Sequence, residues 1–462
     1  MQIKACLKRF ATLLLALTLV ISVAACGSKP ASTDGSKSVS DNATVHAQKT
    51  EAPKEKIKIR FYNLWPKNDD DPGSRSYYKM YAIFKKAHPE VDLELMEDAH
   101  EAWATKIKTM MTANDLPEVY VSQPSDFSVF ADSGVYYDLT DSVNEDKEWK
   151  DSFIAGALNT LAIDGRVYGI PISSYVEGVF YNDELFNKFN LAYPQNYEDL
   201  KNVVKVFAEN GIAAFAVGAK DGWPVTMTTH FLMDREAGFQ YFEDSKTQKE
   251  NTFDNPMYIN AFSKYLELAK MGAFPKGVAG ASFDDSKMLF AQGKAAMMID
   301  GNWDIGWFDQ QDNGNFGKKV KFANFPAIEG GKGVQDAICV GFGKSLCISQ
   351  NADEDQKKAG IELIKTLTNK DAAKIYLEEG GFTCGTKVEN PDNSKVSPLM
   401  VQVNEVVSKS SQTWAAYGEC ITPGFYDEMN KIGQLVILNS ITAEEAAKKM
   451  EKARLEFQLT KN

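Results

Sequence analysis

The first third of the chain alternates between two hydrophobic patterns. Apolar residues occupy every second position over 57–61 and 91–95, which predicts two β-strands. They recur at helical spacing over 77–84 and 103–111, and the mainly apolar segment 116–121 begins a third strand. Strands that alternate with helices indicate a largely parallel sheet.

A continuous apolar run over 295–299 follows Gly293. A glycine at this place ends a helix, and the unbroken run predicts a strand that is covered on both faces. Asp300, Asn302 and Trp303 follow the strand, at the end where ligands of open α/β sheets bind. Two interpretations are open: these side chains contact a ligand, or Trp303 packs on the surface of its own lobe.

The rest of the chain continues the pattern of strands and helices. Segment 168–181 predicts a long strand, 338–348 a hairpin-like pair of strands about Gly341 and Gly343, and 355–368 a helix. About 400 residues remain after the amino-terminal region, more than one hydrophobic core holds. We therefore expect two lobes and a chain that crosses between them repeatedly. The expected lobes are residues 56–170 with 320–368 and residues 171–319 with 369–462.

The amino terminus has the pattern of an export signal. Lys4, Lys8 and Arg9 precede an apolar run over 10–25 that is too short to span a membrane comfortably. The run ends in small residues followed by Cys26, and this resembles the lipobox of a bacterial lipoprotein signal peptide. The resemblance implies cleavage before Cys26 and lipidation of its thiol, which places the chain at the extracytoplasmic face of the membrane. The alternative is an ordinary secretory signal with a chance cysteine.

Residues 1–25 are therefore expected to be a signal peptide and 26–55 a flexible tether. The tether is rich in Ser, Lys, Thr and Asp and has no apolar period. The formal charge of the whole chain is −12, and loss of the three cations in the signal gives −15 for the mature chain. This acidity argues against a nucleic-acid partner and against lying flat on anionic lipid.

The cysteines and histidines do not predict a metal site, and no cofactor is expected. The four cysteines after Cys26 show no Cys-x-x-Cys spacing, and both disulfides and buried free thiols are open for them. The histidines do not cluster in the sequence, which gives little support to a histidine-based metal centre. These residues are Cys339, Cys347, Cys384 and Cys420, and His46, His88, His100 and His230.

Several tryptophans lie in predicted loops or at strand ends rather than on helical stripes. Indole rings suit the apolar face of a sugar ring, and nearby carboxylates and amides suit its hydroxyl groups. For each tryptophan the alternative is burial within one lobe; for Trp103, Trp149 and Trp307 we expect a place in the core or on the surface. The candidate ligand-binding residues are Trp65, Trp223, Trp303 and Trp414, with Gln123, Asp126, Glu177, Asp300, Asn302 and Glu419.

Four short motifs resemble those of one family, in the same order along the chain. They are Leu-Pro-Glu-Val at 116–119, Tyr-Gly-Ile-Pro at 168–171 with Phe-Tyr-Asn at 180–182, Phe-Ala-Gln-Gly-Lys-Ala-Ala-Met at 290–297, and Gly-Asn-Trp at 301–303. Together with the lipobox, they resemble the extracellular solute-binding proteins of ABC importers, the group that includes maltose-binding protein.

The resemblance implies a two-lobed α/β fold of the periplasmic-binding-protein type II class, with a hinge that the chain crosses several times. It implies that a mono- or oligosaccharide binds between the lobes, without chemical reaction, and that the protein docks on the transmembrane subunits of an ABC permease. We expect a monomer. The family's cleft tryptophan falls on Trp303. Tyr175 is a further candidate, although it falls where maltose-binding protein has an acid, and a carboxyl-terminal cleft aromatic falls on Phe425 or Tyr426 rather than on Trp414.

Three alternatives to a sugar-importer component are open. Paired carboxylates such as Glu177 and Asp300 suit a surface glycosidase, although the sequence contains no catalytic signature. A second alternative is a binding protein for a solute other than a sugar. The third is a sensor or adhesion module built on the same fold.

Overall fold

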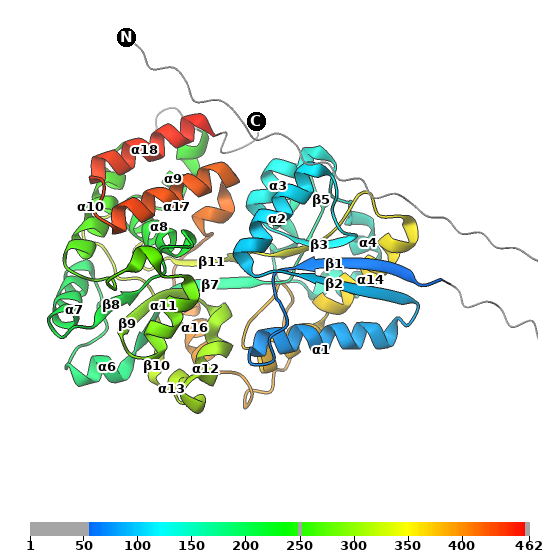
Figure 1. Ribbon diagram of the computed structural model, residues 1–462, viewed down its shortest axis with the longest axis horizontal. Helices are drawn as coiled ribbons and strands as arrows, with labels where there is room; N and C mark the ends of the chain where they lie inside the picture. The colour runs from blue at the N-terminus through cyan, green and yellow to red at the C-terminus, as the bar shows by residue number, and fades with distance from the viewer. Residues whose placement is uncertain (1–54, 248–251, 458–462) are drawn as a thin grey trace, which may run out of the picture. The chain divides into compact units, whose positions relative to one another are not determined.

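The computed structural model describes residues 55–247 and 252–457, which Figure 1 shows as ribbons. The expected signal peptide, the expected lipidation site Cys26 and nearly all of the expected tether lie outside the described residues. Within those two ranges, no helix combines the length and the apolar composition needed to cross a bilayer. Two large mixed β-sheets organise the described part of the chain, one in each lobe.

The first sheet has the strand order β2-β1-β3-β12-β6. The strands β1, β2 and β3 run parallel, as the alternation of strands and helices predicted. Ile59 and Phe61 of β1 are fully buried, whereas Arg60 between them is partly exposed and pairs with Glu118 at 2.8 Å. The strands are β1 (Ile57–Asn63), β2 (Val91–Glu97), β3 (Val119–Ser122), β6 (Ile170–Pro171) and β12 (Ser345–Ile348).

Helices α1 (Pro72–Ala87) and α2 (His100–Ala113) connect the first three strands. Asp71 begins α1, since its side chain accepts hydrogen bonds from the backbone N–H groups of Gly73 and Ser74. The apolar faces of these helices share one core with the first sheet. The lobe also contains α3 (Pro124–Phe130), α4 (Thr140–Glu145), α5 (Lys147–Ser152), the hairpin β4 (Ala162–Ile163) and β5 (Arg166–Val167), α14 (Glu354–Thr368), α15 (Lys370–Ile375) and the π-helical turn η5 (Tyr376–Gly380).

The second sheet has the strand order β13-β11-β7-β9-β8, and β10 also pairs with β7. Every residue of β9 is buried, as the continuous apolar run predicted. Gly293 before it has a φ of 67°, in the left-handed region that a glycine adopts without strain. The strands are β7 (Ser174–Asn182), β8 (Ala213–Ala216), β9 (Ala295–Gly301), β10 (Val320–Ala323), β11 (Ile338–Phe342) and β13 (Thr413–Trp414).

Helices cover both faces of the second sheet (Figure 1). Because both faces are covered, its central strands are apolar on both sides. One face packs against α6 (Asp183–Lys188), α7 (Tyr197–Glu209), α8 (Trp223–Ala237), α9 (Phe239–Thr247), α10 (Pro256–Lys270), α17 (Pro423–Ile437) and α18 (Ala443–Glu456). The other packs against α11 (Phe283–Ala291), α12 (Ile305–Gly314), α13 (Phe316–Lys319) and α16 (Pro398–Lys409).

Within its described residues, the chain passes between the two sheets at three places. Ile172 and Ser173 separate β6 from β7, and Gly343 and Lys344 separate β11 from β12. The third passage follows Thr386 of the first lobe and leads to α16. The two short passages are hydrogen-bonded to each other, from the N–H of Ile172 to the carbonyl of Lys344 and from the N–H of Lys344 to Oγ of Ser173, both at 2.9 Å. These passages form the hinge between the lobes.

The expected hairpin at residues 338–348 is wrong. β11 pairs with β7 and β13, whereas β12 pairs with β3 and β6, so Gly343 and Lys344 form a crossover between sheets rather than a turn. The strand pairing also differs from the expected lobes, because β10 and β11 join the second sheet while α15 and η5 pack in the first core. Apolar periodicity identifies a strand but does not say which strand it pairs with.

Candidate functional site

Side chains from both lobes meet at one place, which we call the inter-lobe site. Helix α3 of the first lobe contacts α17 and the short helix η6 (Tyr417–Cys420) of the second. Nε1 of Trp223 in the second lobe donates a hydrogen bond to Oε1 of Glu101 in the first, at 3.4 Å. The site contains five predicted ligand-binding residues, Gln123, Asp126, Trp223, Trp303 and Glu419, together with His100, Glu101, Trp103 and Lys344.

Asp126 lies in the first turn of α3, directly after β3. Pro124 begins this helix, where the N–H that proline lacks is not needed. The Asp126 side chain is fully buried, and neither of its oxygens has a hydrogen-bond partner in the described chain. Burial raises the pKa of this carboxyl to about 6, and the positive charges of Lys108 and Lys344, followed by the nearby side-chain amide of Gln123, oppose the increase. Because a buried polar group without partners is costly, this carboxylate is suited to accept hydrogen bonds from a ligand.

Lys344 links the two lobes at the hinge. Its Nζ donates a hydrogen bond to Oε1 of Gln123 at 2.6 Å and lies 3.9 Å from Oε1 of Glu419. The other carboxylate oxygen of Glu419 is buried without a partner in the described chain. Burial raises the pKa of Glu419, and the charge of Lys344 opposes that increase. The charge of Lys344 therefore acts on the buried carboxylate of Asp126 in the first lobe and on the partly exposed carboxylate of Glu419 in the second.

Trp103 and Lys344 are members of the site that the sequence did not indicate. Trp103 lies on the apolar stripe of α2 and is fully buried, but its Nε1 has no hydrogen-bond partner among the described residues. Nζ of Lys344 lies 5.5 Å from the centroid of the Trp103 ring, a cation–π contact. Helical spacing assigns Trp103 to the core, and Lys344 stands in a segment predicted as a hairpin. No local signal therefore identified either residue.

Trp223 and Trp303 provide the aromatic part of the site. Their ring centroids lie 6.4 Å apart in an edge-to-face arrangement, and the His100 ring of the first lobe lies 6.3 Å from Trp223. Trp303 is 36% exposed, and it is the one aromatic residue among the exposed large apolar side chains of the described chain. Its ring lies against Gly301, where a Cβ would come within 2.0 Å of the ring carbons. The indole ring can occupy this position because residue 301 is a glycine and has no side chain.

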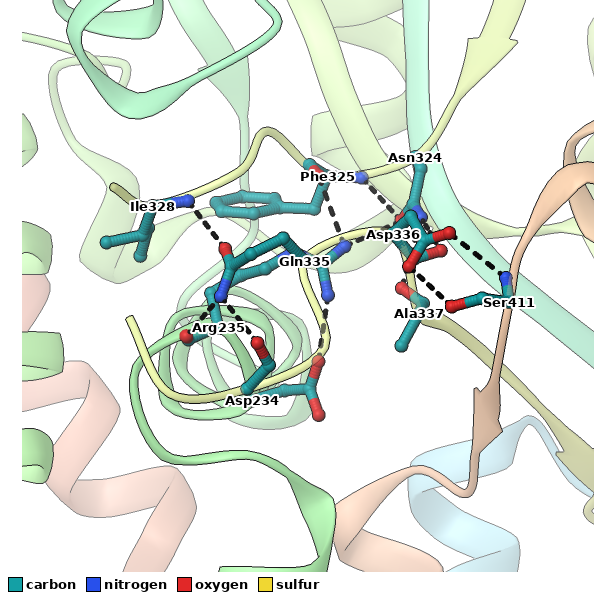
Figure 2. Close-up of polar contacts among 10 residues, drawn as sticks. Asp234, Arg235, Asn324, Phe325, Ile328, Gln335, Asp336, Ala337 and Ser411 are labelled. Carbon is teal, nitrogen blue, oxygen red and sulfur yellow. Dashed lines mark hydrogen bonds and ion pairs between the residues drawn. The ribbon is translucent and has the colours of Figure 1, made fainter. Parts of the chain in front are cut away.

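The helix that carries Trp223 is held in place at its opposite end. Figure 2 shows Arg235, which is fully buried near the end of α8, in a network of polar contacts. Its guanidinium contacts the Asp234 carboxylate at 2.8 Å and donates hydrogen bonds to Oδ1 of Asn324 (2.9 Å) and to the carbonyl of Phe325 (3.1 Å). Nε2 of Gln335 donates to the backbone carbonyl of Arg235 at 2.8 Å. These contacts fix α8, and with it Trp223, against the loop that follows β10.

Three other predicted residues contact groups of their own lobe, and of these Trp65 is only partly buried. Trp65 stacks on Tyr77 of the first lobe, with 4.3 Å between ring centroids. Trp414 is 2% exposed, and its ring meets that of His230 edge-to-face at 5.0 Å within the core of the second lobe. Tyr175 is buried, and its hydroxyl accepts a hydrogen bond from the N–H of Ala416 at 3.0 Å.

Asn302 and Asp300 make contacts within the protein. Oδ1 of Asn302 accepts from the N–H of Val176, and its Nδ2 donates to Oγ1 of Thr383, both at 3.0 Å. Asn302 thus joins β7 to the first-lobe segment beside the hinge. Asp300 is fully buried, and its Oδ1 accepts from the N–H of Gly301. Burial, followed by the charge of Asp304, raises the pKa of Asp300.

The register of β7 and β9 separates the two carboxylates of the glycosidase alternative. Glu177 pairs with Gly301, and Asp300 pairs with Gly178. Because successive side chains of a strand point to opposite faces, Glu177 and Asp300 lie on opposite faces of the second sheet. They cannot act together on one glycosidic bond, which requires two carboxylates that flank it.

The four cysteines in the described part of the chain are free thiols. Cys339, Cys347 and Cys384 are buried free thiols, and Cys420 is a partly buried one. Among the described residues, no disulfide joins any two of these four cysteines. Of the two possibilities that the sequence left open, disulfides and buried free thiols, the second holds for Cys339, Cys347 and Cys384.

Comparison with known proteins gives a consistent result. A family model described as bacterial extracellular solute-binding protein matches residues 69–374. The multiple sugar-binding protein of Streptococcus mutans is 24% identical over 361 residues, which cover 76% of this chain and 80% of that protein.

Solved structures show the same fold. A structure from work on xylan utilization by the thermophilic bacterium Caldanaerobius polysaccharolyticus is 27% identical, with a TM-score of 0.79, and the match covers 86% of this chain and 99% of that one. A chitin oligosaccharide binding protein is 26% identical, with a TM-score of 0.78 and coverage of 87% and 99%. The predicted two-lobed α/β fold of periplasmic binding proteins is thereby confirmed.

Proposed function

Since the chain belongs to the family of bacterial extracellular solute-binding proteins, we propose that it captures a mono- or oligosaccharide between its lobes and delivers it to an ABC-type permease. Proteins of this family bind solutes and are not enzymes, and the opposed faces of Glu177 and Asp300 agree with this. The glycosidase alternative is therefore wrong. Sugar as the ligand is supported by the relation of this chain to the multiple sugar-binding protein of Streptococcus mutans.

The observation that carries the proposal is the Asp126 carboxylate, buried between the lobes with both oxygens free of hydrogen bonds in the described chain. Sugar hydroxyl groups donate hydrogen bonds to carboxylates, and such bonds to a charged acceptor are stronger than neutral ones. The carboxylate of Glu419 in the second lobe is partly exposed, and its buried oxygen Oε2 has no hydrogen-bond partner in the described chain. The exposed ring of Trp303 offers a flat surface for the apolar face of a sugar. This combination of a few placed polar groups with aromatic rings is typical of small-molecule sites.

The hinge supplies a route from ligand binding to lobe closure. Lys344 lies in the crossover and contacts Gln123 of the first lobe and Glu419 of the second. A ligand that donates hydrogen bonds to both Asp126 and Glu419 can contact the two lobes at the same time only when the lobes are closed on each other. It therefore favours the closed arrangement by its differential affinity for that state. Docking of the closed form on the two transmembrane subunits of a permease completes the proposed cycle.

Attachment to the membrane is part of the same proposal. Lipidation of Cys26 after removal of residues 1–25 would hold the protein at the extracytoplasmic face of the cell membrane, with 26–55 as the tether. The support is the resemblance of the segment before Cys26 to a lipobox. The binding body would act as a monomer on this tether, with two lobes built on the two sheets.

Tryptophan fluorescence titrations test the proposed ligand class. The chain is titrated with a panel of mono- and oligosaccharides, with peptides and with polyamines. We expect a saturable change with at least one sugar, because Trp223 and Trp303 lie in the inter-lobe site. The change should decrease in Trp303→Phe and persist in Trp414→Phe, whose ring lies in the core. A response to peptides or polyamines alone would overturn the assignment to carbohydrate.

A further inference from the structure

Three side chains of different chemistry meet in the second lobe, on one face of its sheet. Glu177 of β7, Cys339 of β11 and His230 of α8 place a carboxylate oxygen, Sγ and a ring nitrogen within 4.8 Å of one another. Glu177 and Cys339 are direct partners in the pairing of β7 with β11, so their side chains point to the same face. All three residues are buried, and Glu177 is 6% exposed.

The distances within this cluster are close to those between the ligands of a shared metal ion. Nε2 of His230 lies 3.0 Å from Oε2 of Glu177, and Sγ of Cys339 lies 3.6 Å from the same oxygen. Ligand atoms around a tetrahedral zinc ion lie roughly 3.3–3.8 Å apart, since Zn–N and Zn–O are about 2.0–2.2 Å and Zn–S is about 2.3 Å. Small movements of the side chains would bring the three atoms to these separations.

A second observation concerns the direction of the His230 ring. Its Nε2 is buried and lies at hydrogen-bonding distance from the carboxylate of Glu177, yet it has no hydrogen-bond partner in the described chain. The ring nitrogen therefore lies close to the carboxylate without pointing at it. Ligands of one metal ion show this arrangement, because each lone pair is directed at the ion rather than at the neighbouring ligand.

We propose that Glu177, His230 and Cys339 bind a single zinc ion, which joins β7, β11 and α8. A thiolate, an imidazole and a carboxylate are all accepted zinc ligands, and the thiolate and imidazole disfavour the hard cations calcium and magnesium. A water molecule would take the fourth position of a tetrahedral ion. The zinc ion would be a structural feature of the second lobe. The proposal does not depend on the identity of the solute.

Metal binding by the purified full chain tests this proposal. After treatment with a chelator, the protein is titrated with Zn²⁺, and separately with Co²⁺, in the absence of any sugar. We expect one equivalent of either ion per chain, a thiolate-to-cobalt charge-transfer band in the near ultraviolet, and an increase in the thermal unfolding temperature with Zn²⁺. Cys339→Ser should abolish the charge-transfer band, and His230→Gln should abolish stoichiometric binding.

Matched controls separate this site from adventitious binding. Cys347→Ser removes a buried thiol from the first lobe, and Cys420→Ser removes the partly buried thiol of η6. Both variants should keep the band and the stoichiometry. Absence of stoichiometric zinc in the wild-type chain overturns the proposal and indicates a buried hydrogen-bonded cluster instead. A band that persists in Cys339→Ser also overturns it. If Cys339→Ser fails to fold, the wild-type stoichiometry together with His230→Gln decides the question. Sugar titrations of the zinc-free chain test the proposed function separately.

Discussion

Replacement of Asp126 by Asn is expected to weaken sugar binding strongly while the fold is retained. The carboxylate presents two buried oxygens without partners in the described chain, and a sugar would supply hydroxyl donors to both. The amide keeps one acceptor and replaces the other with a donor. Hydrogen bonds to a charged group contribute about 1.5–3 kcal/mol each. Loss of one bond and of the charge on the other should therefore cost about 2–4 kcal/mol, or roughly 30- to 1,000-fold in affinity.

Asp126 also gives binding an expected pH dependence. Its pKa in the structure, about 6, lies above the ordinary value of 3.8, because burial disfavours the charged form. Between these two values the native chain holds a proton that the unfolded chain has lost. The contribution of this group to stability is therefore greatest below pH 3.8 and is lost as the pH rises through about 6, a difference of about 3 kcal/mol. Asn carries no such cost, so Asp126→Asn should be at least as stable as the wild type at neutral pH.

Calorimetric titration with the sugar found in the fluorescence panel, between pH 5 and pH 8, measures both effects. Wild-type affinity should decrease as the pH falls below about 6, by up to tenfold per pH unit, whereas the affinity of Asp126→Asn should be nearly constant. Asp141→Asn, which changes an exposed carboxylate of the same lobe, serves as the matched control. Wild-type affinity in Asp126→Asn, or an identical pH dependence in both proteins, would refute the reasoning.

Three further substitutions test other parts of the structure. Trp303→Ala should weaken sugar binding by about 2 kcal/mol, roughly 30-fold, without unfolding the chain; loss of the folded circular dichroism spectrum would show instead that this ring is needed for packing. Arg235→Leu should lower the free energy of unfolding, measured by urea denaturation, by about 3–5 kcal/mol, because it leaves the buried carboxylate of Asp234 without its cation. A decrease of less than about 1 kcal/mol would contradict this account. Asn302→Ala should lower the free energy of unfolding by about 1–3 kcal/mol in the same assay, since the N–H of Val176 loses its acceptor. An unchanged free energy of unfolding would contradict this and indicate that water replaces the amide.

The secondary structure of the first lobe and the centre of the second was predictable from local pattern. The alternating positions of 57–61 and 91–95 became β1 and β2, and the unbroken apolar run before Asp300 became the fully buried strand β9. Period and side-chain type are properties of neighbouring residues, so they are present in the sequence before any tertiary contact forms. The family motifs were sufficient for the two-lobed fold, which the comparisons confirm.

The assembly of the site followed from contacts between distant segments. Gly343 and Lys344 were expected to form a hairpin turn, but β11 and β12 pair with different sheets, which places Lys344 in the hinge beside Gln123. Trp103 lies on an apolar helical stripe like any core residue, and only the approach of Lys344 distinguishes it. Trp414 lies at a short strand, but the helices around it enclose the ring in the core.

The proposed zinc site could likewise not be predicted from local sequence, because it depends on tertiary contacts. Glu177, His230 and Cys339 are too far apart in sequence for any ligand spacing to be recognised, and the histidines did not predict a metal centre. The register of β7 with β11 and the packing of α8 on their face bring the three side chains together. A sequence pattern specifies which face of an element is apolar, whereas strand pairing and helix packing decide which polar groups share a site.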